Sequence, residues 1–558
     1  MHPRLLAPIA AALLLAQPGT ASADPAPVEA PAPAPAAAPA APPRLIVAIA
    51  VDQFSADLFA QYREHFTGGM ARLLGGAVFP SAYQSHAATE TCPGHSTILT
   101  GDHPARTGII ANTWYDPAIA RADKRIYCAE DERDPASTSG QPVVSAAHLK
   151  VPTLGEWMKR ADPRSRNVAV SAKDRAVMMM GGRQIDEGYW YLRGQFVTLK
   201  GRPLHPAAVA ENAELAADIA RGAPALAATP ACALHERPIT AGRTTVGQGR
   251  FELSPNQPEA FRVSPRMDLA TIGLALRLVK EMQLGSGAAP DLLSISLSAT
   301  DYIGHATGTE GVEMCIQMAT LDAGLRTLFD QLDAANLDYA VVLTADHGGF
   351  DLPERLDQQA LPAAQRVDAG LSPAALGQAL AKATGITVPG PLVYGDGSFG
   401  DFYLSHAVAK ADRPRAAAAL ARLARQHPQV AAAYTRAELG AVPVPAGDPQ
   451  DWTLIQRARG SFDPARSGDV VVLLRRAVVP IPQPGPGIVA THGSPWDYDR
   501  RVPMLFWRKG MAGFEQPAPV ETVDIAPTLA ALLRLRLPAG TFDGRCLDLD
   551  GGVGDTCR

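Results

Sequence analysis

The chain has 558 residues, with 51 Lys and Arg against 56 Asp and Glu, and a formal net charge of -5. This near balance excludes a dedicated binder of nucleic acid or of anionic membranes, because such proteins carry a clear excess of positive charge. Hydrophobic residues make up 47% and charged residues 19%, which is enough apolar material for a large core and too little charge for a disordered chain. The length allows roughly two to four domains, or one large α/β domain with insertions.

The N-terminus has the pattern of an export signal. A single Arg precedes an apolar stretch that is too short to span a membrane, and an Ala-Ser-Ala run ends at Ala23. We therefore predict a signal peptide over residues 1–23, cleaved after Ala23, and a periplasmic or secreted product. In residues 24–43, 17 of 20 are Ala or Pro, which predicts an extended tether. No later apolar run predicts a membrane-spanning helix.

Export affects how the six cysteines are interpreted. In an oxidising compartment cysteines more often form disulfides than act as metal ligands or nucleophiles, and none here lies in a Cys-x-x-Cys pair. Six cysteines allow many pairings, and only Cys546 with Cys557 is close enough in sequence to suggest one. The other four are Cys92, Cys128, Cys232 and Cys315.

Five short aliphatic runs predict buried strands. They are residues 45–51, 167–172, 292–298, 339–344 and 502–507. Continuous apolar strands are typical of a sheet covered on both faces, with helices connecting parallel strands. Helices are predicted over residues 153–160, 267–282, 313–335 and 413–426. The pattern predicts an α/β fold.

Residues able to bind a metal stand next to four of these strands. The six are Asp52, Asp301, His305, Asp346, His347 and His492. Reactive groups gather at the carboxyl ends of strands in open α/β sheets, and mixed Asp and His ligands suit zinc. A single Asp at a strand end is more often a turn or helix cap, and an Asp-His pair can simply be hydrogen-bonded. Taken together, however, six such residues predict a metal site, and they suffice for two ions.

The segment from His86 to Gly101 offers a nucleophile. Thr89, Thr91 and Ser96 are candidates. Thr91 is expected at the start of a helix, where free N–H groups and the helix dipole favour an alkoxide and a bound phosphate. The structural alternative is that Thr91 only caps that helix. His95, one turn into the helix, is expected to have a structural role.

At these residues the chain resembles the alkaline phosphatase superfamily, which contains two-metal phosphatases, phosphodiesterases and sulfatases. The motifs that carry the resemblance occur in order along nearly the whole mature chain: LIVAIAVDQF, TETCPGHSTILTG, DYIGHATG, TADHGGF, THGSPWDYDRRVPMLF and VETVDIAPTLAALL. The resemblance implies a three-layer α/β sandwich with a mostly parallel central sheet, helices on both faces and inserted cap segments. It implies one catalytic domain over residues 44–558, with insertions at about 181–266 and 352–489.

The same resemblance implies two zinc ions per chain. Asp52, Thr91, Asp346 and His347 would hold one ion, and Asp301, His305 and His492 would hold the other. Sulfatases of this superfamily have a Cys-x-Pro-x-Arg signature, whereas this chain has Thr91, Pro93 and His95 at the matching positions. This difference disfavours a sulfatase.

The branch most similar to this chain is the phosphate-irrepressible bacterial alkaline phosphatases, which have a Thr nucleophile and a Lys-x-Arg pair. Lys173 and Arg175 supply that pair, and Asn112 matches a phosphate-contacting Asn of the family. Two cations suit a phosphate monoester, which carries two negative charges where a diester carries one. A solvated surface pair and an ordinary turn Asn are the structural alternatives.

We therefore expect zinc-dependent hydrolysis of small phosphate monoesters through a phosphothreonine intermediate, by a monomer without a nucleic-acid partner. Some diesterase activity could accompany it. The nearest alternative is a nucleotide pyrophosphatase/phosphodiesterase of the same fold, related through its Thr nucleophile. A phosphoryl transferase and a non-catalytic exported metal-binding protein are the more distant ones.

Overall fold

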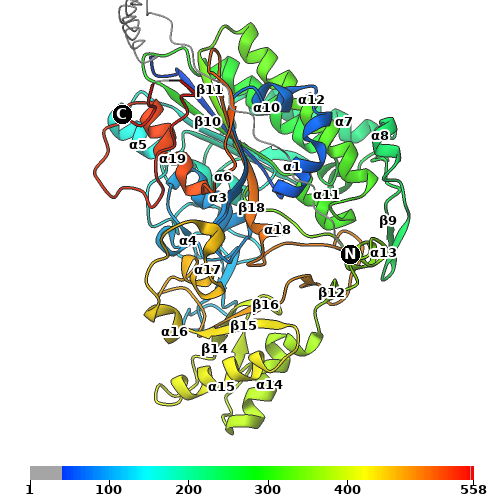
Figure 1. Ribbon diagram of the computed structural model, residues 1–558, viewed down its shortest axis with the longest axis vertical. Helices are drawn as coiled ribbons and strands as arrows, with labels where there is room; N and C mark the ends of the chain where they lie inside the picture. Colours follow the sequence, from blue (N-terminus) through cyan, green and yellow to red (C-terminus); the bar gives the residue numbers. More distant parts are fainter. Residues whose placement is uncertain (1–40, 553) are drawn as a thin grey trace, which may run out of the picture. The chain divides into compact units, whose positions relative to one another are not determined.

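The computed structural model describes residues 41–552 and 554–558, so the predicted signal peptide and most of the predicted tether lie outside the described residues. Its central feature is a nine-stranded sheet with the order β19-β2-β18-β11-β1-β10-β5-β6-β7 (Figure 1). The strands are β1 (Leu45–Val51), β2 (Ala77–Tyr83), β5 (Asn167–Ser171), β6 (Glu187–Leu192), β7 (Gln195–Val197), β10 (Asp291–Leu297), β11 (Tyr339–Thr344), β18 (Arg501–Arg508) and β19 (Phe514–Glu515). All five predicted strands are present, and the predicted α/β fold is confirmed.

The middle of the sheet is parallel. Strands β11, β1, β10, β5 and β6 pair in parallel, whereas β18 pairs antiparallel with both β11 and β2. The central sheet is thus mostly parallel, as expected, and β18 is a strand that runs against its neighbours. Because β18 runs the opposite way, its beginning lies at the same edge as the carboxyl ends of the parallel strands. Residues just before β18 can thus join residues that follow β1, β10 and β11.

Helices cover both faces of the sheet (Figure 1). On one face lie α10 (Arg266–Met282) and α12 (Val312–Ala334), which pack on each other, and α7 (Pro206–Arg221) packs on α10. On the other lie α3 (Thr91–Thr100), α5 (Leu154–Ala161), α6 (Asp174–Gly181) and α19 (Ile525–Leu532). The helices on the two faces exclude water from the strands, so all seven residues of β1 are buried. This explains why the strands read as unbroken apolar runs.

A smaller four-stranded sheet lies within the predicted insertion at 352–489. Its order is β13 (Val393–Tyr394), β14 (Gly400–Leu404), β16 (Val470–Leu474), β15 (Val430–Thr435). Helices α14 (Pro373–Thr384) and α15 (Arg413–Arg425) pack on it around a separate cluster of buried apolar side chains that includes Leu380, Phe402, Leu420 and Val472. Phe402 and Val472 lie on the side of the small sheet that faces these helices. Successive side chains of a strand point to opposite faces, so the neighbours of these two residues lie on the other face. They are Asp401, Tyr403, Val471 and Leu473. Those four line the cavity described below.

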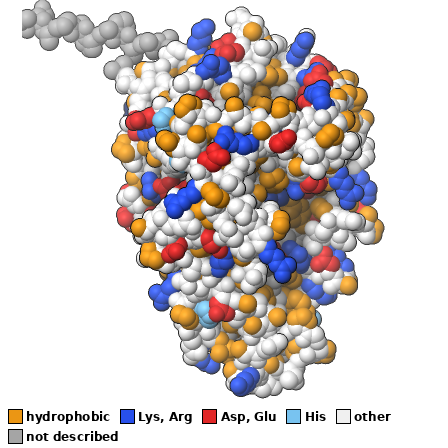
Figure 2. Space-filling view, turned by 90° about the vertical axis from the view of Figure 1, so that its right-hand side faces the viewer, with side chains coloured by type: hydrophobic (Ala, Val, Ile, Leu, Met, Phe, Trp, Pro, Cys, Tyr) orange, Lys and Arg blue, Asp and Glu red, His pale blue; other side chains and the backbone are white. Residues whose placement is uncertain are grey.

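All six cysteines are paired, as Cys92–Cys128, Cys232–Cys315 and Cys546–Cys557. The local pairing expected from the sequence is confirmed, and three disulfides indicate an oxidising compartment. Within residues 41–552 and 554–558, none of the helices has the length and apolar character needed to cross a membrane. Acidic and basic side chains are interspersed on the face shown in Figure 2, in keeping with the small net charge.

Candidate active site

Six predicted metal-competent residues meet at the carboxyl edge of the central sheet. Asp52 follows β1, while Asp346 and His347 follow β11. Asp301 and His305 lie four residues apart on α11 (Ala299–Thr307), directly after β10, so both face the same side of that helix. His492 comes from the segment before α18 (Asp497–Arg500) and β18. The antiparallel course of β18 is what brings this last residue to the others.

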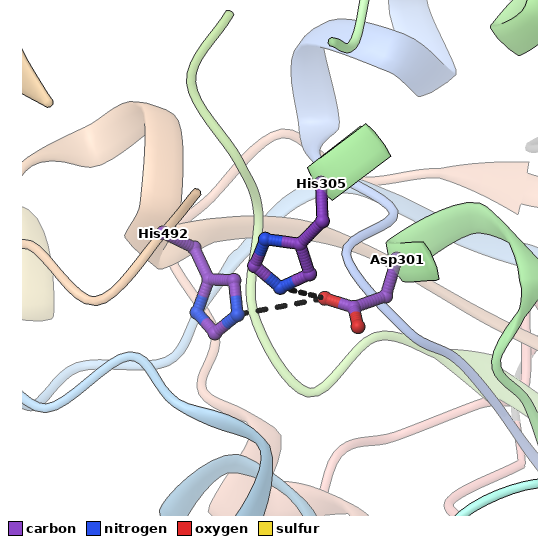
Figure 3. A group of neighbouring side chains, drawn as sticks. All are labelled: Asp301, His305 and His492. Carbon is purple, nitrogen blue, oxygen red and sulfur yellow. Dashed lines mark ion pairs between the residues drawn. The ribbon is translucent and has the colours of Figure 1, made fainter. Parts of the chain in front are cut away.

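The first group consists of Asp301, His305 and His492, whose ligand-type atoms lie within 4.8 Å of one another (Figure 3). The Oδ1 atom of Asp301 is 3.3 Å from Nε2 of His305 and 3.4 Å from Nε2 of His492. A carboxylate and two imidazoles at such distances can hold a divalent ion such as zinc.

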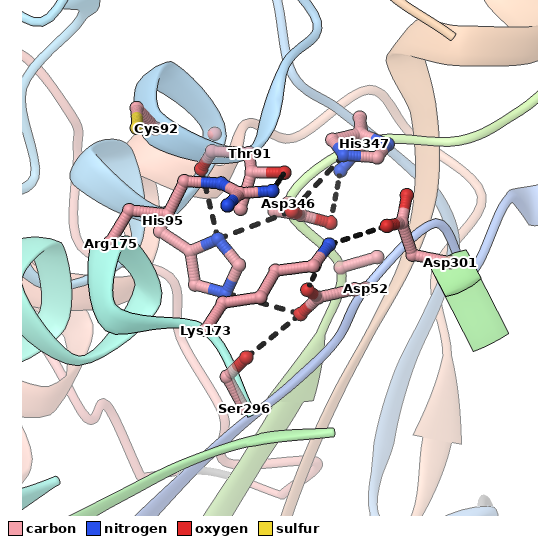
Figure 4. Close-up of polar contacts among 12 residues, drawn as sticks. Asp52, Thr91, Cys92, His95, Lys173, Arg175, Ser296, Asp301, Asp346 and His347 are labelled. Atoms are coloured by element: carbon pink, nitrogen blue, oxygen red, sulfur yellow. Dashed lines mark hydrogen bonds and ion pairs between the residues drawn. The ribbon is translucent and has the colours of Figure 1, made fainter. Parts of the chain in front are cut away.

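The second group lies deeper. Asp52, His95 and Asp346 have ligand-type atoms within 4.8 Å of one another, and Nε2 of His347 is 3.1 Å from Oδ2 of Asp346 (Figure 4). The ring of His347 stacks on that of His492 with 3.6 Å between centroids, so the two groups adjoin. The structure therefore holds two neighbouring groups that could each bind a metal ion.

His95 lies between the two carboxylates of the deeper group. Its Nε2 atom is 3.3 Å from Asp52 Oδ1, and its Nδ1 atom is 3.2 Å from Asp346 Oδ2 and 2.9 Å from the carbonyl oxygen of Thr91. With Nδ1 hydrogen-bonded and Nε2 in ion-pair contact with Asp52, His95 can hold Asp52 and Asp346 in place. This geometry fits the structural role expected from the sequence.

The histidines of both groups share one hydrogen-bonding pattern. The Nδ1 atoms of His305, His347 and His492 lie 2.8–2.9 Å from the backbone carbonyls of Ala490, Gly348 and Thr89, respectively. Such a bond requires the proton on Nδ1 and leaves the lone pair on Nε2, the arrangement that second-sphere contacts impose on metal-binding histidines. Burial, together with His347, lowers the pKa of His492 well below its ordinary value, so this imidazole is neutral.

Unsatisfied atoms offer a test of whether a metal fits. Oδ2 of Asp346 and Nε2 of His347 are buried and form no hydrogen bond, although ion-pair contacts surround them. Buried polar atoms without partners are costly, and a coordinated cation would satisfy both at once. The residues present therefore fit a bound divalent cation.

The carboxylates are ionised. Burial alone would raise the pKa of Asp301, but Lys173 and His305 hold it well below its usual range. Burial would likewise raise the pKa of Asp346, and His347 contributes most to holding it well below. Both carboxylates are therefore in the form that binds cations.

Thr91 is the first residue of α3, with Glu90 as the N-cap. Its side chain is buried at this edge of the sheet, and Arg175 Nη2 donates to its Oγ1 over 3.4 Å (Figure 4). Thr91 is therefore not the helix cap, and its hydroxyl faces a guanidinium at the positive end of the helix. An anion bound here would meet both.

Asn112 braces the start of α3. Its Oδ1 accepts from the backbone N–H of Cys92 over 2.8 Å, and its own N–H donates to Oε2 of Glu90 over 2.9 Å. The carbonyl oxygen of Asn112 accepts from the N–H of Cys128, which the disulfide joins to Cys92. Only the Asn112 amide NH₂ has no part in these bonds, and it is available to donate to an anion beside Thr91.

Lys173 lies between the two groups of possible ligands. Its ammonium is 2.9 Å from Asp52 Oδ2 and 2.5 Å from Asp301 Oδ2. Burial alone would lower the pKa of Lys173, but Asp301 and Asp52 raise it above its ordinary value, so it is charged. Both members of the predicted Lys-x-Arg pair therefore contact this site, Lys173 fully buried and Arg175 partly buried.

Sequence reasoning missed two residues that hold the ligands. Gln53 donates from its backbone N–H to Asp346 Oδ1 (3.1 Å) and from Nε2 to Asp301 Oδ1 (3.4 Å), bridging the two groups. Ser296 donates to Asp52 Oδ1 over 2.9 Å. For Gln53, the one signal in the sequence was its position directly after Asp52. For Ser296 the sequence held no signal, because its contact with Asp52 depends on the pairing of β10 with β1.

The fold and this site define a class of protein: α/β proteins that place two adjoining groups of metal-competent side chains, with a buried Thr beside them, at the carboxyl edge of a mostly parallel sheet. Comparison with known families identifies the member. Residues 46–495 match the model of the type I phosphodiesterase / nucleotide pyrophosphatase family, and the chain belongs to that family. The resemblance inferred from the motifs is thereby confirmed.

Curated relatives are similar over almost their whole length. The chain is 52% identical over 520 residues to alkaline phosphatase PhoK of Sphingomonas sp. The aligned region covers 92% of this chain and 93% of PhoK. The chain is 48% identical over 519 residues to alkaline phosphatase PhoD of Zymomonas mobilis, covering 92% and 89%. Among solved structures, wild-type alkaline phosphatase PafA superimposes with a TM-score of 0.77 at 22% identity, over 91% of this chain and 99% of that one. This last match supports the fold.

Proposed function

We propose that the protein is an exported alkaline phosphatase that hydrolyses small phosphate monoesters through a phosphothreonine intermediate. The observation that carries the proposal is the position of Thr91, which lies at the start of α3 against Arg175 and next to the two groups of possible metal ligands. The names of two relatives at about half identity support the same activity.

Zinc is the ion that the ligand types favour. Asp52, Thr91, Asp346 and His347 would hold one ion, and Asp301, His305 and His492 the other. When bound, two such ions supply charge stabilisation for the attacking and leaving oxygens and lower the pKa of coordinated oxygen. The ionised Asp301 and Asp346 and the neutral His492 described above suit that role.

The chain's own residues perform the transfer. The Thr91 hydroxyl gives up its proton and its Oγ1 forms a bond to phosphorus while the bond from phosphorus to the alcohol oxygen breaks; the leaving alcohol oxygen takes up one proton, so the step is balanced. Water then attacks the phosphothreonine, which returns free Thr91 and releases inorganic phosphate. Arg175, the Asn112 amide and Lys173 would stabilise the charge on the phosphoryl oxygens in both steps.

Charge supports a monoester over a diester. A monoester brings two negative charges and a diester one. Arg175 forms no ion pair within the described part of the chain, and Lys173 adds a second positive charge beside it, although its ammonium also pairs with Asp52 and Asp301. Two cations near the phosphate therefore favour the substrate with more negative charge. This balance is why we place the monoesterase ahead of the phosphodiesterase.

The test is to replace Thr91 with Ala in the purified protein and to measure phosphate release, covalent phosphate on the protein after acid quenching, and zinc content. We expect turnover to fall by about 1,000-fold or more and the phosphorylated protein to vanish, with most of the zinc retained. Thr327→Ala is the matched control, since Thr327 is exposed on α12 and its hydroxyl donates to the carbonyl oxygen of Ala323, away from the candidate site. Full activity in Thr91→Ala would overturn the assignment, and a strong preference of the unaltered protein for diesters would favour the phosphodiesterase.

A further inference from the structure

A cavity of about 370 Å³ opens directly onto the candidate active site. One wall contains residues of that site, among them Asn112, Arg175, His305 and His492. The facing wall comes from the inserted small sheet and its loops, including Phe399, Asp401 and Tyr403. If Thr91 attacks a phosphate held by Arg175 and Asn112, the alcohol part of the substrate has to extend into this space. The inference below rests on that proposed function.

The polar lining of the cavity is mainly acidic. Glu90, Asp396 and Asp401 contribute carboxylates, and the one Lys or Arg among the described lining residues is Arg175, which contacts Thr91. Asp396 is already neutralised, since it forms an ion pair with Arg125 (2.6 Å). Two carboxylates therefore remain for a ligand.

Glu90 and Asp401 are each held by one backbone bond. Glu90 Oε2 accepts from the N–H of Asn112 (2.9 Å), and Asp401 Oδ1 accepts from the N–H of Gly468 (2.6 Å). Within the described part of the chain neither forms an ion pair, and the second oxygen of each accepts no side-chain hydrogen bond. Both side chains are fixed in orientation yet keep acceptor capacity towards the cavity.

Aromatic rings complete the lining. Tyr115 and Tyr403 contribute rings whose centroids lie 5.8 Å apart, and Phe399 adds a third. A side chain at Gly493 would come within 2.9 Å of the Phe399 ring and 3.7 Å of Glu90 Cγ, so this ring and this carboxylate lie together beside His492. Aromatic faces next to carboxylates attract cations and hold alkylammonium groups well.

We propose that this cavity is a leaving-group pocket that selects phosphate monoesters of amino alcohols, whose ammonium group would lie between Glu90, Asp401 and the Phe399 ring. The substrate would then meet two opposite charges in one site. Its phosphate would face Arg175 and Lys173, and its cation would face the carboxylates. The two charged ends would thus bind the substrate in one orientation only. Anionic alcohols would be disfavoured by the same carboxylates.

Two esters that differ only in charge provide the test. Phosphocholine and 3,3-dimethylbutyl phosphate have the same shape, but the second carries carbon in place of the ammonium nitrogen. For the zinc-loaded protein we expect kcat/KM to be at least about tenfold higher for phosphocholine, with the ratio falling as salt is added. In Asp401→Asn the ratio should drop by about fivefold, whereas Asp396→Asn should keep most of it, because Asp396 is already paired.

The outcomes separate this inference from the proposed function. If both esters are hydrolysed with a ratio near one, or if Asp401→Asn leaves the ratio unchanged, the pocket assignment is wrong while the phosphatase stands. If no monoester is hydrolysed, both fail. Inhibition by the free alcohols gives an independent readout, since choline should compete with substrate better than 3,3-dimethylbutanol does.

Discussion

A single glycine sets how closely α3 approaches the metal-competent carboxylates. A β-carbon at Gly94 would stand 1.9 Å from the carbonyl oxygen of Asp346, which is backbone and cannot swing away. Gly94 thus allows the helix that presents Thr91 to lie against the turn that presents Asp346 and His347. The position of the nucleophile relative to these ligands depends on this contact.

We expect Gly94→Ala to be harmful despite the better helix propensity of alanine. Alanine gains about 1 kcal/mol over glycine in a helix interior, but pushing α3 away from Asp346 should cost about 3 kcal/mol in overpacking. The shift would also displace Thr91, and such misplacement can lower turnover by about 100-fold. Denaturant unfolding and phosphate release would measure the two effects.

Gly140→Ala is the matched control, because a β-carbon there meets no atom within 4 Å. It should change neither stability nor activity appreciably. If Gly94→Ala behaved like this control, the close packing of α3 on Asp346 would not be what positions Thr91.

At the scale of single residues, the sequence predicted which residues belong to the candidate site better than it predicted which side chains contact one another. Asp52 and His347 could be singled out because strand ends are recognisable and because six Asp and His residues occur at or near such ends, although each alone has common structural roles. Glu90 and Ser296 could not, because each acts through an oxygen placed beside another segment of the chain: Glu90 on Asn112, Ser296 on Asp52. Local patterns carry no signal for such pairs.

Among the elements, the buried strands were predictable and the direction of one was not. Strand β18 has the same apolar pattern as β1, because burial on both faces dictates composition regardless of direction. Its antiparallel course follows from where the chain re-enters the sheet after the 352–489 segment. His492 was predicted as a ligand from its motif, and its route to the candidate site depends on that reversal.

The disulfide Cys92–Cys128 links the first turn of α3 to the segment after β4 (Arg125–Tyr127) and closes around Asn112. Replacing both cysteines with Ala should lower the free energy of unfolding by about 2–4 kcal/mol. It should also weaken inhibition by inorganic phosphate several-fold, because the Asn112 amide would lose its bracing. Unfolding curves and phosphate inhibition constants would show this.

The pair Cys546–Cys557 provides the control. It closes a short loop near the C-terminus and contacts none of the ligands described above. Removing it should reduce stability but leave phosphate inhibition as it was. Equal loss of phosphate binding in both double variants would mean that the Cys92 disulfide acts on general stability alone.

At the scale of the whole molecule, a buried histidine joins distant parts of the chain. His103, just before α4 (Pro104–Thr107), lies between Glu521 (3.0 Å from Nε2) and Asp543 (3.3 Å from Nδ1). It thereby ties the helix pair α3–α4 to the last 40 residues. Arg106 also contacts Asp543, and Asp102 contacts Arg106.

This cluster should make stability depend on pH. Burial alone would lower the pKa of His103, but Asp543 and Glu521 raise it to about 10, against 6.5 for a free histidine. Because the folded pKa is the higher one, protonated His103 stabilises the fold fully below about pH 6.5, and the contribution fades as pH rises through 10. The shift corresponds to at most about 5 kcal/mol.

The contribution of His103 to stability can be isolated by comparing the unaltered protein with His103→Gln. The other titrating groups are present in both proteins, so their effects cancel in the difference. The free energy of unfolding should be lower in the variant by several kcal/mol at pH 6, and the difference should shrink steadily towards pH 10. Because His103 follows the end of α3 opposite to Thr91, activity at neutral pH should fall only as far as the folded fraction does. A difference that stays constant from pH 6 to pH 10 would show that His103 contributes packing and not charge. The link between the C-terminal segment and α3–α4 would then rest on Arg106 and the apolar contacts of α19.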